Sequence, residues 1–149
     1  MAAHPPSVLI IESRFYEDIA NDLAEGAIAE LENREVAFER ISVPGALEIP
    51  VALGIAVRQG VVGAGFKHQG CVALGCVIRG ETSHYDIVAG ESAHGLMQIA
   101  IEHALPVGNG ILTVDNRAQA EARASVEGKN KGGGAAAACL ALMNFNAKT

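Results

Sequence analysis

The chain has 149 residues, of which 50% are hydrophobic and 19% charged, and its formal net charge is −6. This length fits one domain, residues 1–149, which can bury about 68–70% of the surface that its unfolded chain exposes. The apolar content excludes a disordered protein, and the acidic balance argues against nucleic acid as a partner. Charges, Gly or Pro interrupt every apolar run before the roughly 20 residues of a membrane helix, so no membrane partner is expected.

Cysteine and histidine positions indicate neither a disulfide framework nor a metal site. Cys71, Cys76 and Cys139 form an odd set without CxxC spacing. His94 and His103 are nine residues apart, which turns them to opposite faces of a helix. The first six residues have neither the basic start nor the apolar core of a signal segment. We therefore expect a cytoplasmic protein that binds no metal.

Four strand-like runs alternate with Ala-rich helical stretches along the chain. Residues 8–11 are a continuous apolar run, as in a strand buried on both faces of a parallel sheet. A helix follows from about Glu17, and the second strand, 36–43, contains polar Glu39 and Arg40 and so belongs nearer an edge. The remaining elements expected, in chain order, are a helix over 46–59 with Pro50 in its first turn, a strand over 70–78, a helix over 85–104, a strand over 107–114, and helices over 116–126 and 133–145.

This alternation predicts an α/β fold with three α-β-α layers around a four-stranded parallel, flavodoxin-like sheet. Ligands of such folds bind outside the carboxyl ends of the strands, where the strand order reverses. The rule directs attention to loops 13–16, 44–48, 79–84 and Asp115-Asn116.

The loop after the third strand has two interpretations. Gly80, Thr82 and His84 at a strand's carboxyl end suit an anion and a proton carrier, because backbone N–H groups near a helix start bind anions. Alternatively, Thr82 or Ser83 is simply the helix N-cap and His84 lies in the first turn. Spacing alone does not decide between them.

Other polar and aromatic residues also allow two readings. Arg123 and Lys131 could hold a phosphate, but composition favours an ordinary solvated surface. Phe15 and Tyr16 are more typical of a core than of a stacking platform, although the predicted ligand edge makes stacking plausible. Cys76 lies in an apolar strand, which favours a small buried hydrophobe over a nucleophile.

Several segments, in order and at matching separations over about residues 8–145, resemble lumazine synthase. The most specific is Gly-Cys-Val-Ile-Arg-Gly-Glu-Thr-x-His-Tyr at 75–85. The others are Pro-Gly-Ala-Leu-Glu-Ile-Pro at 44–50, Gly-Ile-Leu-Thr at 110–113, Gln-Ala at 119–120 with Arg-Ala at 123–124, and Asn-Lys-Gly at 130–132.

The resemblance implies a reaction without a cofactor. This family condenses 5-amino-6-(D-ribitylamino)uracil with 3,4-dihydroxy-2-butanone 4-phosphate, releasing phosphate and water, in the penultimate step of riboflavin synthesis. By analogy His84 would move protons. Phe15 would stack on the pyrimidine, and the rest of the pyrimidine and ribityl site would comprise Ala46, Leu47, Glu48, Val77, Ile78, Asn109 and Lys131. The phosphate site would comprise Gly80, Glu81, Thr82 and Arg123.

Three positions depart from the family pattern. Asn109 stands where most relatives carry a Phe contributed across a subunit boundary, Gly134 where an acidic residue is usual, and Tyr16 where Asn is usual. None removes His84 or Arg123, so activity is still expected. A weakened relative that serves as a flavin-binding or shell-forming protein is the alternative. A receiver-like signalling module fits poorly, because Glu12 stands alone after the first strand and Arg79 follows the third.

Family members form pentamers, some of which build 60-subunit icosahedral shells, with active sites between neighbouring subunits. The resemblance therefore implies a homo-oligomer. Pro5-Pro6 cannot donate backbone hydrogen bonds to a neighbour's sheet, which favours a free pentamer over a 60-subunit shell.

Overall fold

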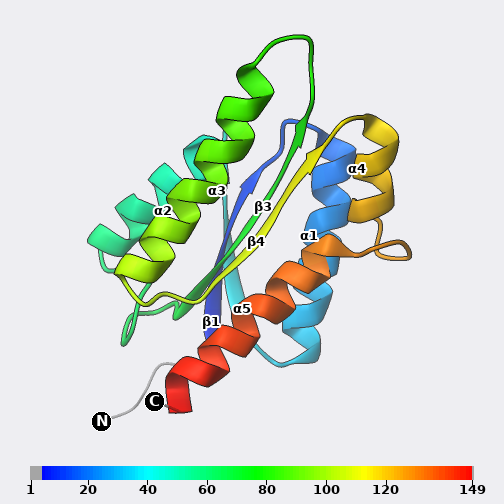
Figure 1. Ribbon diagram of the computed structural model, residues 1–149. Coiled ribbons are helices and arrows are strands. Elements are labelled where there is room, and N and C mark those ends of the chain that lie inside the picture. Colours follow the sequence, from blue (N-terminus) through cyan, green and yellow to red (C-terminus); the bar gives the residue numbers. More distant parts are fainter. Residues whose placement is uncertain (1–4, 149) are drawn as a thin grey trace.

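The computed structural model describes residues 5–148. Met1 to His4, part of the segment in which we expect no signal, lie outside the described residues. The elements follow in the order β1 (Ser7–Ser13), α1 (Glu17–Asn33), β2 (Ala37–Val43), α2 (Glu48–Arg58), β3 (Gly70–Ile78), α3 (His84–Glu102), β4 (Val107–Val114), α4 (Arg117–Ala124) and α5 (Lys131–Lys148) (Figure 1).

The strands form a four-stranded, all-parallel sheet in the order β2-β1-β3-β4. Helices α1, α4 and α5 cover one face, and α2 and α3 cover the other (Figure 1). The predicted three-layer α/β fold is confirmed, and β2 lies at an edge as its polar residues indicated.

Alternate residues of β1 supply the two halves of the core. Val8 and Ile10 pack under α1, whereas Leu9 and Ile11 pack under α2. All four side chains are buried, because the central strand has helices on both sides. This double burial is the physical reason for the uninterrupted apolar run in the sequence.

Two helices begin two residues away from their expected starts. Helix α2 begins at Glu48 rather than at 46, since residues 44–47 form the turn that leaves β2. Helix α5 begins at Lys131 rather than at 133 and extends to Lys148. Glycines 132–134 are therefore helical, although glycine is a poor helix former.

Close packing of α5 on α1 explains why glycine occurs at the start of α5. A Cβ atom on Gly132 would lie 2.1 Å from the carbonyl oxygen of Leu23 in α1. Asn130, with a positive φ of 46°, precedes the helix, and its side-chain oxygen accepts a hydrogen bond from the Gly133 N–H at 3.2 Å. The contact of Gly132 with α1 and the Asn130–Gly133 hydrogen bond together fix the position of the Lys131 backbone.

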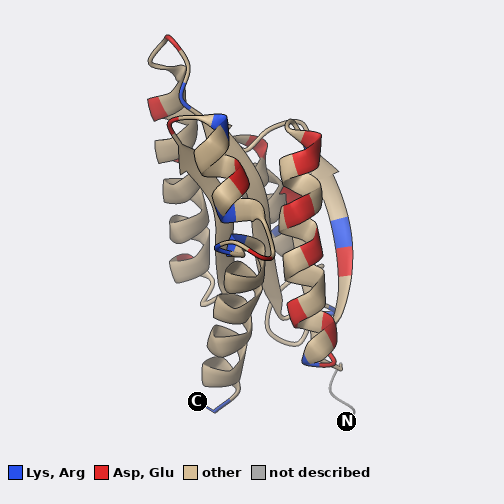
Figure 2. Cartoon of the chain, turned by 90° about the vertical axis from the view of Figure 1, so that its right-hand side faces the viewer, with Lys and Arg blue, Asp and Glu red and all other residues tan. Residues whose placement is uncertain are grey.

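The β4 edge of the molecule carries exposed apolar side chains. On α3, Met97 and Ile101 are 61% and 73% exposed, and on α5 Leu142 and Phe145 are exposed as well. These side chains line a groove of about 390 Å³ beside β4. Figure 2 shows that α5 carries no charge along most of its length, whereas acidic residues run along α1. Within residues 5–148, no helix is long and apolar enough to cross a membrane.

Candidate functional site

A cavity of about 430 Å³ opens at the carboxyl edge of the sheet. Residues that follow β1, β2 and β3 line it, and the strand order reverses between β1 and β3. This is the location that parallel α/β sheets use for ligands. Of the four loops that the sequence singled out, Asp115-Asn116 is absent from the lining.

The cavity brings together most of the residues that the sequence assigned to a site. Those in its wall are Phe15, Ala46, Leu47, Glu48, Val77, Ile78, Gly80, Thr82 and His84. Ser13 lines the cavity too and belongs to loop 13–16, which the sequence singled out. Tyr85 and Val88 also line the cavity, although the sequence analysis did not assign them to it. Helical spacing could have identified Val88, because it follows His84 by one turn.

Phe15 offers an open aromatic face to the cavity. Its side chain is 75% exposed, and its ring packs edge-on against Tyr16 with centroids 5.0 Å apart. The aromatic pair follows β1 directly, where the chain leaves the sheet before α1. A planar heterocycle could therefore stack on the ring.

The loop from β3 to α3 presents its polar groups to solvent and to the cavity. His84 is the first residue of α3, so the positive end of that helix lies beside the cavity. Thr82 Oγ1 accepts a 3.3 Å hydrogen bond from the His84 N–H, whereas the N-cap Ser83 makes no side-chain capping bond. Thr82 thus bonds an N–H at the start of the helix and also lines the cavity, so helix capping does not exclude a ligand site in this loop.

Arg79 ties this loop to the end of β4. Its Nε donates to Asp115 Oδ1 at 3.1 Å, and its guanidinium lies 4.2 Å from the centre of the Tyr85 ring. Asp86 adds a longer ion pair at 3.6 Å. The hydrogen bond to Asp115 raises the pKa of Arg79. Asp115 therefore contributes to the site as an anchor rather than as part of the wall.

Four predicted site residues lie outside the cavity wall of their own chain. Glu81 is in the β3–α3 loop but does not line the cavity. Arg123 is in α4, none of whose residues lines the cavity, and its Nη1 donates to the Gln119 carbonyl at 3.1 Å. Lys131 is exposed at the start of α5. Asn109 is exposed on β4 and lines the apolar groove.

Cys76 contributes an unreactive thiol to the cavity. It is half-buried, and desolvation raises the pKa of its thiol to about 11. The thiolate that a nucleophile needs is thus disfavoured near neutral pH. The sequence interpretation of Cys76 as a small buried hydrophobe holds only in part, because Cys76 is half-buried and lines the cavity.

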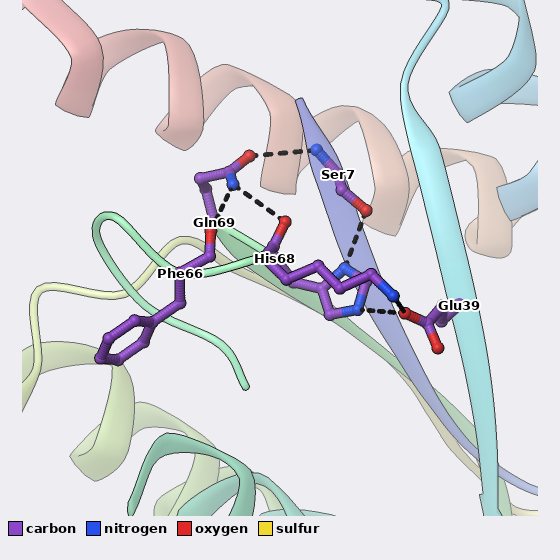
Figure 3. A network of polar contacts seen from close by, with 6 residues as sticks. Ser7, Glu39, Phe66, His68 and Gln69 are labelled. Atoms are coloured by element: carbon purple, nitrogen blue, oxygen red, sulfur yellow. Dashed lines mark hydrogen bonds and ion pairs between the residues drawn. The ribbon is translucent and has the colours of Figure 1, made fainter. Parts of the chain in front are cut away.

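A second polar cluster lies at the amino end of the sheet (Figure 3). His68 Nδ1 is 2.8 Å from Ser7 Oγ, and His68 Nε2 is 3.0 Å from Glu39, which also pairs with Lys67. The order Ser-His-Glu resembles a hydrolase triad, but His68 is 1% and Ser7 6% exposed, so no substrate could reach the hydroxyl. The cluster instead fastens the segment before β3 to β1 and β2. Among the described residues, no group of three or more His, Cys, Asp or Glu could hold a metal ion.

Comparison with known proteins identifies the family. The family model described as 6,7-dimethyl-8-ribityllumazine synthase matches residues 5–147. A protein of that name from Beijerinckia indica is 55% identical over 138 residues, which cover 93% of this chain and 74% of the relative. One from Methylocella silvestris is 57% identical over 134 residues, covering 90% of this chain and 81% of the relative. One from Xanthobacter autotrophicus is 56% identical over 138 residues, covering 93% and 83%.

The matched region includes every strand of the sheet and every residue of the cavity wall. The sequence identities of 55–57% to these relatives are also far above the level at which two proteins share only a fold. The resemblance found in the sequence motifs is confirmed, and the chain belongs to the 6,7-dimethyl-8-ribityllumazine synthase family of transferase enzymes.

Proposed function

We propose that the chain condenses 5-amino-6-(D-ribitylamino)uracil with 3,4-dihydroxy-2-butanone 4-phosphate, releasing phosphate and water, in the penultimate step of riboflavin synthesis. The observation that carries this proposal is the composition of one cavity wall. It combines an open aromatic ring at Phe15, a carboxylate at Glu48, and Thr82 and His84 at a helix N-terminus. These groups match the parts of the two substrates.

The pyrimidine and its ribityl chain would occupy the side formed by β1 and the β2–α2 loop. Phe15 stacks on the ring, and the backbone of Val77 and Ile78 forms hydrogen bonds with the polar atoms at the edge of the ring. Ala46, Leu47 and Glu48 hold the ribityl chain, where the Glu48 carboxylate can accept hydrogen bonds from hydroxyl groups.

The phosphate substrate would occupy the other side, at the start of α3. Gly80 and Thr82 lie beside the phosphate, with Glu81 between them in the same loop but outside the cavity wall, and the helix N-terminus favours the negative charge of the phosphate. His84 transfers protons between the reacting groups, a role that suits imidazole near neutral pH. Most of the acceleration would come from holding the amine against the ketone, an effect worth up to about 7–11 kcal/mol.

Arg123, Lys131 and Asn109 would complete the site of a neighbouring copy rather than that of their own chain. Arg123 lies on α4, none of whose residues lines the cavity, and Asn109 lies on the edge strand β4. The exposed apolar side chains of α3 and α5 beside β4 supply a surface that a second copy can cover. A guanidinium from the neighbour could then bind the phosphate through two parallel hydrogen bonds.

We further propose a pentamer, with a 60-subunit icosahedral shell as the alternative assembly. The three cysteines are free thiols, which agrees with the reducing cytoplasm as the compartment.

The test is the formation of the lumazine, followed by its absorbance, from the two substrates. His84→Ala should slow turnover by one to a few orders of magnitude and leave the fold intact, because positioning supplies most of the catalysis. His94→Ala is the matched control, since His94 is an exposed histidine of the same helix outside the cavity wall. Absence of product from the unmodified protein, or an unchanged rate in His84→Ala, would contradict the proposal. Flavin binding without turnover would point to the non-catalytic alternative.

A further inference from the structure

A buried carboxylate lies in β1, three residues before Phe15 of the cavity wall. Glu12, near the end of β1, has a side chain that is 3% exposed. Its Oε1 accepts a hydrogen bond from Arg14 Nη1 at 2.7 Å and one from Arg40 Nη2 at 3.0 Å, and its Oε2 accepts one from Arg40 Nε at 2.6 Å. Burial by itself would raise the pKa of Glu12, but the two guanidinium groups outweigh it and hold the pKa below its ordinary value of 4.5.

The two arginines fasten different parts of the protein to this carboxylate. Arg40 extends from the edge strand β2. Arg14 lies in the short segment that joins β1 to α1, and it also donates a hydrogen bond to Asn21 Oδ1 on α1. Arg14 therefore ties the β1–α1 segment both to the sheet and to the helix.

The cavity residues and these anchors lie in the same short stretch of chain. Ser13, Phe15 and Tyr16 line the cavity, whereas Glu12 bonds to Arg14, and Arg14 bonds to Asn21 of α1. Fixing the Arg14 side chain therefore also fixes the backbone from which the neighbouring Phe15 side chain extends.

Phe15 has little else to hold it in place. Its ring is mostly exposed and packs edge-on against Tyr16, which is itself the N-cap of α1 without a side-chain capping bond. The ring therefore depends on the backbone of its segment for its position over the cavity.

We propose that Glu12 and Arg14 are positioning residues that hold Phe15 in place for stacking on the pyrimidine substrate. This inference rests on the proposed function. Neither group touches the substrate, because both act through the backbone between β1 and α1. The role predicts an effect on the pyrimidine substrate alone, since the phosphate substrate is bound at the start of α3.

The test compares two variants that each remove one guanidinium from the same carboxylate. Arg14→Met should raise KM for the pyrimidine about three- to tenfold, the range expected for a weakened aromatic stack, and leave KM for the phosphate substrate unchanged. Arg40→Met is the matched control, and it should change KM for the pyrimidine by less than about twofold because both Arg14 bonds remain. Arg14→Lys should recover part of the loss, since Lys supplies one of the donors.

A binding measurement separates this inference from the proposed function. Titration with 6,7-dimethyl-8-ribityllumazine, followed by its fluorescence, should show weaker binding to Arg14→Met by the same factor as the rise in KM. Failure of the unmodified protein to form product would overturn the proposed function. Equal changes in Arg14→Met and Arg40→Met, or equal rises in KM for both substrates, would overturn the positioning role instead. If Arg14→Met does not fold, Asn21→Ala removes only the second Arg14 bond and should raise KM in the same direction, and an unchanged KM would refute the inference.

Discussion

The junction between α1 and α5 makes a sharp prediction about stability. In Gly132→Ala the new Cβ would lie 2.1 Å from the Leu23 carbonyl oxygen, whereas ordinary van der Waals contact begins at 3.4 Å. The two helices would have to separate by at least about 1.3 Å. Helix α5 is also close to β4, where a Cβ on Gly108 would lie 1.9 Å from the Ala135 carbonyl oxygen. A rigid shift of α5 would therefore disturb a second tight contact.

The expected loss is the difference between two effects. Replacing a helical glycine by alanine gains roughly 0.5–1 kcal/mol, whereas overpacking typically costs about 1–3 kcal/mol and occasionally more. Because the clash here is with backbone atoms, we expect the upper part of that range and a net loss of about 2 kcal/mol. For a chain of this size, that corresponds to a fall in Tm of roughly 4–8 °C.

Gly134→Ala is the matched control for this prediction. It makes the same change two residues further along α5, where a Cβ would meet nothing within 4 Å. It should leave stability unchanged or raise it by up to about 1 kcal/mol. Thermal and urea unfolding at equal protein concentration would measure both variants, since association shifts the apparent stability. Similar Tm values for the two variants would refute the packing argument.

Three further predictions concern the phosphate, acid stability and assembly. Arg123→Ala should raise KM for the phosphate substrate far more than KM for the pyrimidine. Arg123→Lys should restore only part of the activity, because Lys cannot form two parallel hydrogen bonds with a phosphate. Equal rises in KM for both substrates would instead indicate that Arg123 has a structural role. Since the folded pKa of Glu12 lies below its ordinary value of 4.5, its carboxylate stabilises the fold above that pH, and this contribution is lost as the pH falls through the folded pKa. The urea midpoint should therefore decline below about pH 5, with a smaller decline in Glu12→Gln, and parallel pH curves would contradict this account. Light scattering should find a particle of five subunits, about 77 kDa from chains of 15.4 kDa, and a megadalton particle would instead indicate the shell.

Local patterns in the sequence determined the sheet and the location of the cavity. The apolar run at 8–11 predicted a doubly buried strand, and the bounds of β3 and β4 agree with those expected. Burial and periodicity are properties of neighbouring residues, so a sequence records them directly. Once the strands were known, the position of loops 13–16, 44–48 and 79–84 at one edge followed from the topology of parallel sheets.

Tertiary packing alone decided which distant side chains meet. The sequence showed Glu12 as a lone acid, but the fold buries it between Arg14 and Arg40 from two different segments. It also places Arg123 on α4, outside the cavity wall of its own chain, which motif order could not show. Contacts of this kind depend on how helices and strands that are far apart in the sequence pack against one another. The start of α5 has the same origin, because contact with the Leu23 carbonyl, rather than local helix propensity, accounts for helical glycine at position 132.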